Sequence, residues 1–396
     1  MRIEEFGVER WMDLYETRCE WNLAETSVDS LTLGELLSIC GRGGKEEELL
    51  KELLEMRLTY GAIPGSLRLR RAISALYQTV SPEEILIAHG AIGANALVYQ
   101  ALVDPGDHVV AVAPTYQQHH SIPESLGAEV DALNLAPERS FLPDPAELKR
   151  LMRPNTKLLA LNNPNNPSGS LIKKDLMEAL LDIAAKSGAW VLCDEVYRGL
   201  DDDGDGFSAS AADLYEKAVS TGSMSKAYSL AGLRLGWLAG RAPGLIQAVM
   251  THRDYNTISV GMIDDLLASI ALESFRGILD RNQNITRVNR SLLAGWIERE
   301  PLVGWTPPRS GTTALLKLLI DVPSWDFCVR LVEETGVMLT PGSAMGMEGY
   351  LRIGYACSTS VLANGLKLLT EFLRRNEADF SKGSPKSLSS GSHAGA

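Results

Sequence analysis

Cysteine is scarce in this chain, and its few cysteines lack the spacing of a metal site. The 396 residues include five cysteines, none of them in a Cys-x-x-Cys pair. An odd, dispersed set of this kind is typical of reduced thiols that pack as small core residues. We therefore expect neither a disulfide framework nor a bound metal ion.

Long apolar runs are also missing. No stretch reaches the roughly 18–20 apolar residues that a membrane-spanning helix needs. Residues 1–6 contain acidic side chains and lack the apolar centre of a secretion signal. These absences predict a cytoplasmic protein that has no membrane partner.

An excess of basic charge is absent too. The chain has 38 Lys and Arg residues against 50 Asp and Glu residues, a formal net charge of -12. Such a surface repels a phosphate-rich polymer, so we expect no nucleic acid partner.

A chain of 396 residues with 45% hydrophobic and 22% charged residues fits a globular protein with one large and one smaller domain.

Short apolar runs alternate with helical patterns in the middle of the chain. The runs cover residues 85–87, 109–112, 158–161 and 190–193, and the clearest helical pattern covers residues 173–186. Strands separated by helices predict a mainly parallel sheet, and uninterrupted apolar strands fit burial on both faces. The expected fold class is α/β.

The pattern changes toward both ends of the chain. Residues 45–285 are expected to form the large domain. Residues 286–378 begin with a long helical pattern and continue with strand-like pieces, which predict a smaller α+β domain that residues 1–44 complete. Residues 379–396 are rich in Ser, Gly, Lys and Ala, and they predict a disordered tail.

The strongest chemical signal is Lys226, which ends the motif Ser223-Met224-Ser225-Lys226 and is followed by Arg234. A lysine that attacks a carbonyl must lose its proton readily, and burial near other cations favours that loss. Hydroxyl groups and an arginine are typical ligands of a phosphate monoester. Taken alone, the motif is more often a solvated lysine in a Ser/Gly loop.

Two further polar motifs each follow an apolar strand. Residues 162–169 read Asn-Asn-Pro-Asn-Asn-Pro-Ser-Gly, and residues 194–197 read Asp-Glu-Val-Tyr. Ligands of open α/β sheets bind at the carboxyl ends of the strands. The joint occurrence of both motifs ahead of Lys226 therefore favours one shared site.

This set of motifs resembles the aspartate aminotransferase superfamily, the fold-type-I enzymes of aminotransferase class I/II that depend on pyridoxal 5′-phosphate (PLP). The resemblance covers about residues 20–375. It implies PLP as the cofactor and a homodimer. It also implies a seven-stranded, mostly parallel sheet in the large domain, beside a smaller α+β domain.

The resemblance also implies a role for each motif residue. Lys226 would carry PLP as a Schiff base and move the proton, while Asp194 would keep the pyridine nitrogen protonated so that the ring accepts electrons. Tyr197 and Asn166 would reach the phenolic oxygen. Arg352, in Leu-Arg-Ile-Gly-Tyr, would bind the substrate α-carboxylate, with Asn166 beside it.

The remaining expected contacts surround the ring and the phosphate. Tyr116 would stack on the ring, and Tyr60 would reach the phosphate of the neighbouring subunit. The expected phosphate ligands are Ser223, Ser225, Arg234 and the helix start Gly90-Ala91-Ile92. Because many relatives have a hydroxyl residue where this chain has Ala91 and Ile92, backbone amides must carry more of the phosphate binding.

These motifs define the cofactor better than the reaction, because the same residues support transamination, elimination and decarboxylation. We predict an aminotransferase that moves the amino group of an L-amino acid to a 2-oxo acid. β-Elimination, replacement or cyclisation remains open, because residues 253–259 and 310–314 are similar to capreomycidine synthase, which cyclises a hydroxylated arginine. The intact set of Lys226, Asp194 and Arg352 argues against a non-catalytic scaffold.

Several other features carry weaker signals. Residues 201–206 imitate half of a calcium loop, but Ala212 stands where the bidentate glutamate belongs, so a solvated acidic turn is the better interpretation. His119 and His120 follow Tyr116 and could face the substrate, but a structural or merely polar role is the better interpretation. No second arginine stands out that would bind the second carboxylate of a dicarboxylate substrate. Glu25 could meet a basic side chain of the substrate, but an ordinary surface glutamate is the preferred interpretation.

Overall fold

The computed structural model describes residues 2–201 and 206–380. Residues 202–205 of the acidic turn and residues 381–396 of the expected tail lie outside this part of the chain. The first two residues of that expected tail belong to helix α14 (Thr359–Phe380).

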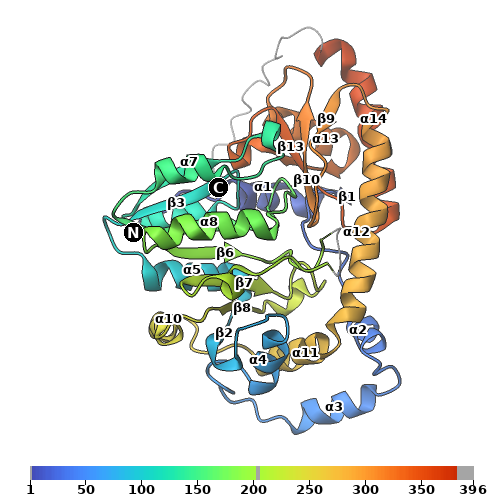
Figure 1. The fold of residues 1–396 in the computed structure, drawn as a ribbon. Helices are drawn as coiled ribbons and strands as arrows, with labels where there is room; N and C mark the ends of the chain where they lie inside the picture. Colours follow the sequence, from blue (N-terminus) through green and yellow to red (C-terminus); the bar gives the residue numbers. More distant parts are fainter. Residues whose placement is uncertain (1, 202–205, 381–396) are drawn as a thin grey trace, which may run out of the picture.

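A seven-stranded sheet organises the larger part of the molecule (Figure 1), with the strand order β2-β8-β7-β6-β5-β3-β4. The strands are β2 (Ile85–Ala88), β3 (His108–Ala113), β4 (Glu129–Asn134), β5 (Thr156–Asn162), β6 (Trp190–Asp194), β7 (Ala218–Ser223) and β8 (Gly236–Ala239). Strand β8 runs in the opposite direction to the other six strands. The predicted α/β fold with a mostly parallel seven-stranded sheet is confirmed.

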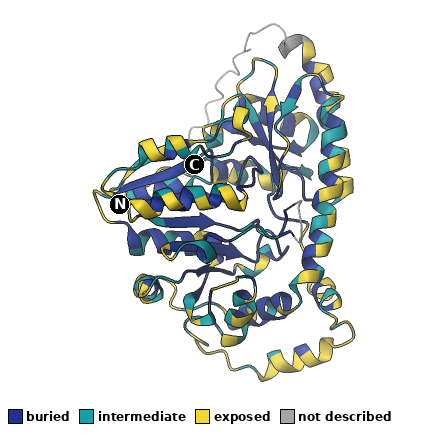
Figure 2. Ribbon diagram, viewed as in Figure 1, coloured by how far each residue is buried: buried dark blue, intermediate teal, exposed yellow. Residues whose placement is uncertain are grey.

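Helices cover both faces of this sheet, so its central strands are buried along almost their whole length (Figure 2), and β3, β5 and β6 are largely apolar. Within β5, Leu158 and Ala160 pack with α5 (Gly90–Leu102) and α10 (Leu245–Asp254). Their neighbours Leu159 and Leu161 point the other way, toward α7 (Pro145–Leu151) and α8 (Lys174–Lys186). Successive side chains of a strand alternate between the two faces, so each face receives its own apolar cluster.

A smaller four-stranded antiparallel sheet, ordered β12-β13-β10-β9, lies beyond the large one. Its strands are β9 (Val303–Trp305), β10 (Thr313–Leu318), β12 (Thr340–Pro341) and β13 (Tyr350–Gly354). It packs with α13 (Ser324–Thr335) and α14, and α12 (Phe275–Ile297) runs beside both parts of the molecule (Figure 1). The domain boundary proposed after residue 285 falls inside this continuous helix.

The start of the chain joins the smaller sheet. Strand β1 (Trp21–Asn22) pairs in parallel with β11 (Val337–Met338). Trp11, in α1 (Gly7–Tyr15), and Leu23 are fully buried in the apolar core of this part, together with residues of α13 and α14. The N-terminal segment is thereby fixed close to residues that lie more than three hundred positions away.

The remaining helices surround these layers: α2 (Leu33–Ile39), α3 (Glu46–Glu55), α4 (Leu67–Ser74), α6 (Gln118–Ser125), α9 (Ala211–Leu214) and α11 (Met262–Glu273). Short 3-10 turns are η1 (Glu16–Arg18), η2 (Pro82–Glu84), η3 (Pro137–Arg139), η4 (Ala231–Leu233) and η5 (Gly342–Met345). Among the described helices, none combines the length and the apolar character needed to cross a membrane.

Candidate active site

A pocket of about 380 Å³ opens at the carboxyl ends of β5, β6 and β7. Every expected site residue lines it except Tyr60. These expected residues come from Gly90 to Arg352, so the fold brings together segments that are far apart in the sequence. Tyr60 lies outside the pocket with 69% of its surface exposed, and its role remains a prediction.

Lys226 reaches the pocket from the loop after β7. Its Nζ donates a hydrogen bond to Thr26 Oγ1 at 2.6 Å and lies 3.9 Å from Glu25 Oε1. Burial lowers the pKa of Lys226, and the positive charge of Arg352 lowers it further, although Glu25 opposes both effects. The amine is therefore more readily deprotonated than an ordinary lysine, as a nucleophilic amine requires.

Asp194 ends β6 and is almost fully buried. Asn95 Nδ2 donates to its Oδ2 at 2.8 Å, and the backbone N–H of Val196 donates to its Oδ1 at 3.2 Å. Asn95 is in turn held by Thr221, whose hydroxyl donates to Asn95 Oδ1 at 2.7 Å. These bonds fix the direction in which the carboxylate faces the pocket.

His119 stands behind Asp194, where its Nε2 lies 3.6 Å from Asp194 Oδ2. This nitrogen is buried without a hydrogen-bond partner, while Nδ1 lies 2.9 Å from the hydroxyl of Tyr99. The side chain does not line the pocket. Its position agrees with the structural interpretation of this histidine.

Arg352 lies in the middle of β13, with 3% of its surface exposed. Its guanidinium donates to Asn166 Oδ1 at 3.3 Å, to Ala24 O at 3.1 Å and to Thr340 Oγ1 at 3.1 Å. The Nε–H is buried and has no partner. Buried donors are almost always paired, so a group of this kind indicates capacity for an anionic ligand.

Tyr197 lies beside these groups and is almost fully buried. Burial raises the pKa of Tyr197 to about 12, against the opposing effects of Thr26 and of the positive charge of Arg352. The phenol therefore keeps its proton near neutral pH and is available as a hydrogen-bond donor.

The opposite end of the pocket has the features of a phosphate site. Helix α5 starts at Gly90, and Arg234 adopts a left-handed conformation with φ of 47° that brings its side chain close to this helix start. At Gly236 a Cβ atom would lie 2.3 Å from the carbonyl carbon of Gly90, so only glycine allows β8 to approach this closely. The helix N-terminus, Arg234 and Ser223 together supply donors for an anion.

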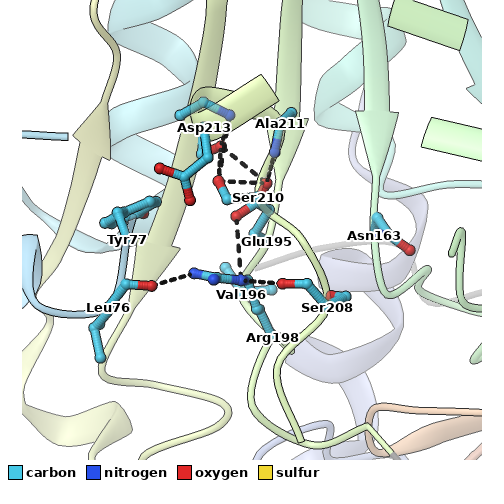
Figure 3. Close-up of polar contacts among 12 residues, drawn as sticks. Leu76, Tyr77, Asn163, Glu195, Val196, Arg198, Ser208, Ser210, Ala211 and Asp213 are labelled. Carbon is cyan, nitrogen blue, oxygen red and sulfur yellow. Dashed lines mark hydrogen bonds and ion pairs between the residues drawn. The ribbon is translucent and has the colours of Figure 1, made fainter. Parts of the chain in front are cut away.

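Glu195 turns away from the pocket, although it stands between Asp194 and Val196. It accepts hydrogen bonds from Ser210 Oγ at 3.1 Å and Ala211 N at 2.9 Å (Figure 3). Ser220 Oγ also donates to it, at 2.9 Å. Burial raises the pKa of this carboxyl group. Glu195 thus joins the loop before α9 to β7 and takes no part in the pocket lining.

Several pocket residues carried no signal in the sequence. Glu9, Met12 and Glu16 line the pocket from α1 and the turn after it, and Tyr116 donates a hydrogen bond to Glu9 Oε1 at 3.0 Å. Asn95 stands in an apolar helix without a motif around it. Only the helical spacing of residues 9, 12 and 16 indicates in advance that the three share a face.

A lysine with a lowered pKa, a buried carboxylate fixed by amides and a phosphate-binding helix start fit a cofactor that has an aldehyde, a basic ring nitrogen and a phosphate. This fold and this pocket define a PLP-dependent enzyme. The chain belongs to the aminotransferase class I and II family, whose model matches residues 44–369.

Individual relatives support the same family. Capreomycidine synthase of Streptomyces vinaceus is 30% identical over 369 residues, which cover 92% of this chain and 93% of that protein. Aspartate/prephenate aminotransferase of Thermus thermophilus is 28% identical and is matched over 83% of this chain and 87% of its own length.

A solved structure shows the likeness in three dimensions. The crystal structure of a PLP-dependent aminotransferase from Streptococcus suis has a TM-score of 0.91 and 42% identity, covering 95% of this chain and 99% of that one. The family, the fold and the PLP cofactor that the sequence predicted are thereby confirmed.

Proposed function

We propose that this enzyme transfers the amino group of an L-amino acid to a 2-oxo acid, with PLP attached to Lys226. The observation that carries the proposal is the buried guanidinium of Arg352, which shares a pocket with Lys226 and has an unpaired N–H. A buried arginine with a free donor favours a carboxylate, which both an amino acid and a 2-oxo acid carry.

When bound, PLP supplies a ring that accepts electrons from the substrate Cα. Asp194 is positioned to hold the ring nitrogen protonated, because Asn95 and the backbone of Val196 fix its orientation. Lys226, with its lowered pKa, is the group that takes the proton from Cα and returns it. Tyr197 lines the same pocket and is proposed to donate a hydrogen bond to the phenolic oxygen of PLP.

The proposed phosphate ligands are Arg234, Ser223, Ser225 and the amides of Gly90, Ala91 and Ile92. All of them line one pocket with Lys226, which supports a single bound PLP molecule. Because Ala91 and Ile92 lack hydroxyl groups, the backbone of α5 and Arg234 carry most of this binding.

We also propose a homodimer in which Tyr60 reaches the pocket of the second copy. Tyr60 lies on the surface near other exposed apolar side chains of the same segment, Leu54 and Leu58. Such a group of exposed apolar residues favours contact with another protein surface.

A cyclising or eliminating reaction is the second candidate, because capreomycidine synthase is 30% identical to this chain. Of the two stretches that suggested this likeness, one lies next to the pocket: Thr312 donates to Thr26 O at 2.6 Å, and Gly311 lies against the ring of Tyr197. In the other stretch, Arg253 is fully buried and bonds backbone carbonyls, which is a structural role.

A donor screen separates the two candidates. L-amino acids are incubated with the PLP-loaded enzyme and either pyruvate or 2-oxoglutarate, and the new amino acid and free ammonia are measured separately. Transamination yields a new amino acid in proportion to the oxo acid consumed, without ammonia. Ammonia release that does not depend on the acceptor would support elimination instead. Lys226→Ala serves as the inactive control for both readouts.

A further inference from the structure

Helix α1 presents an acidic face to the pocket. Glu9, Met12 and Glu16 line the pocket at a spacing that places them on one side of the helix, continued into η1. Trp11 points the other way into the core, where its ring meets Trp325 at 5.0 Å between centroids. Because Trp11 is held in the core, the opposite face of α1, with Glu9 and Met12, lies toward the pocket.

Glu25 adds a third carboxylate. Its Oε1 accepts hydrogen bonds from the backbone N–H groups of Thr26 at 2.7 Å and Ser27 at 2.8 Å. We call Glu9, Glu16 and Glu25 the three pocket glutamates. They come from the first 25 residues, a different part of the chain from the residues proposed to bind PLP.

The charges in the pocket do not balance once cofactor and substrate are considered. Three cations line it, Lys226, Arg234 and Arg352, against Asp194 and the three pocket glutamates. In the proposed function, Arg234 faces the phosphate, Arg352 faces the α-carboxylate, Lys226 is bound to PLP and Asp194 faces the ring nitrogen. Glu9 and Glu16 are then left without a counter-charge, and Glu25 has only Lys226, 3.9 Å from its Oε1.

The glutamates also repel one another. Burial raises the pKa of Glu16, and the negative charges of Glu25 and Glu9 raise it further. Within residues 2–201 and 206–380, no cationic side chain forms an ion pair with Glu9 or Glu16. A cation bound between these carboxylates would relieve that repulsion. Met12, which lies between Glu9 and Glu16 on the same face, offers apolar surface for the methylene stem of a long side chain.

We propose that the amino-acid substrate has a cationic side chain, a guanidinium or an ammonium group, which the three pocket glutamates bind while Arg352 binds the α-carboxylate. This rests on the proposed function, because Arg352 defines which end of the substrate is the amino-acid end. The unpaired, buried N–H of Arg352 is an observation independent of the glutamates, and it marks the same pocket as a ligand site.

Paired substrates that differ only in charge test the proposal on the PLP-loaded enzyme. L-Arginine is compared with L-citrulline, its neutral isostere, and L-lysine with L-norleucine. Binding is measured from the change in the cofactor absorption band, and turnover is measured separately. A hydrogen bond to a charged group stabilises a complex more than one between neutral groups. We therefore expect the cationic member of each pair to bind about tenfold more tightly, or better.

Two single substitutions test whether the glutamates of α1 and η1 cause that preference. In Glu16→Gln and in Glu9→Gln, the arginine-to-citrulline ratio of binding constants falls about tenfold toward one. Glu20→Gln is the matched control, because Glu20 is an exposed glutamate of the same segment that does not line the pocket. Its ratio stays at the wild-type value, and circular dichroism checks that all variants are folded.

The outcomes distinguish this proposal from the one on which it rests. Equal binding of arginine and citrulline by the wild type, or an equal loss of both in Glu16→Gln, overturns the cationic substrate class. If citrulline and norleucine react as well as their charged partners, the proposed amino transfer stands and only the substrate class is wrong. If no amino acid changes the absorption band, the proposed function itself is wrong.

Discussion

Replacing Arg352 with lysine is the sharpest test of how the substrate is held. The guanidinium makes three hydrogen bonds in the pocket wall, and its buried Nε–H has no hydrogen-bond partner. Lysine keeps the positive charge but has no planar fork, so it cannot bond the wall and a carboxylate in the same geometry. The substitution therefore removes at least one charge-assisted hydrogen bond to the substrate.

The expected loss follows from the energy of such bonds. One or two hydrogen bonds to a charged group contribute roughly 1.5–3 kcal/mol each. At about 1.4 kcal/mol per tenfold change, kcat/KM for an amino acid should fall by roughly two orders of magnitude in Arg352→Lys. An amine that lacks the carboxylate should be a poor substrate of the wild type and should lose much less.

The assay compares kcat/KM for an amino acid and for the matching amine in the wild type, Arg352→Lys and Arg375→Lys. Arg375 is an exposed arginine of α14 that serves as the control for a general effect of the substitution. Thermal unfolding is followed in parallel, because Arg352 also connects β13 to Ala24. An equal loss of kcat/KM for the amino acid and the amine would show that Arg352 does not bind the substrate carboxylate.

Three further predictions concern the cofactor. Borohydride should bleach the yellow protein and fix PLP covalently on Lys226, and peptide mapping that finds the label on another lysine would refute the central assignment. Asp194→Ala should keep PLP attached but lose orders of magnitude in turnover, whereas Arg234→Ala should lose PLP on dialysis; loss of PLP from both would contradict the role of Asp194. Burial lowers the pKa of Lys226 and Glu25 raises it, so Glu25→Gln should lower that pKa further. The pH midpoint for PLP attachment should then move down in spectroscopic titrations, and an upward or absent shift would contradict the electrostatic argument.

The strands that the sequence predicted are those with an unbroken apolar run. Strands β2, β3, β5 and β6 are of this kind, because helices bury both of their faces. The edge strand β4 escaped prediction because it is partly exposed and alternates acidic with apolar residues. Strand β7 is fully buried yet rich in Ser, Thr and Gly. The hydroxyl groups of Ser220 and Thr221 donate to Glu195 and Asn95, which lie in other segments of the chain.

The site residues also divide into those that a local motif indicates and those that only the fold brings into place. Lys226, Asp194 and Arg352 stand in short motifs whose chemistry is visible locally, and the structure places them in one pocket. Asn95 and Thr26 gain their positions only from contacts between distant segments, so no local pattern could have indicated them. The roles of all these residues remain predictions that the substitutions above would test.

The lining of one pocket by α1 has an evolutionary consequence. The residues proposed to hold PLP lie mainly on the large sheet and its loops, whereas the wall proposed to bind the substrate side chain comes largely from a short helix near the start of the chain. Mutations in α1 can therefore alter which amino acid is accepted while the PLP ligands stay unchanged. Exchange of this helix between relatives would offer a route to new substrate ranges on an inherited catalytic centre.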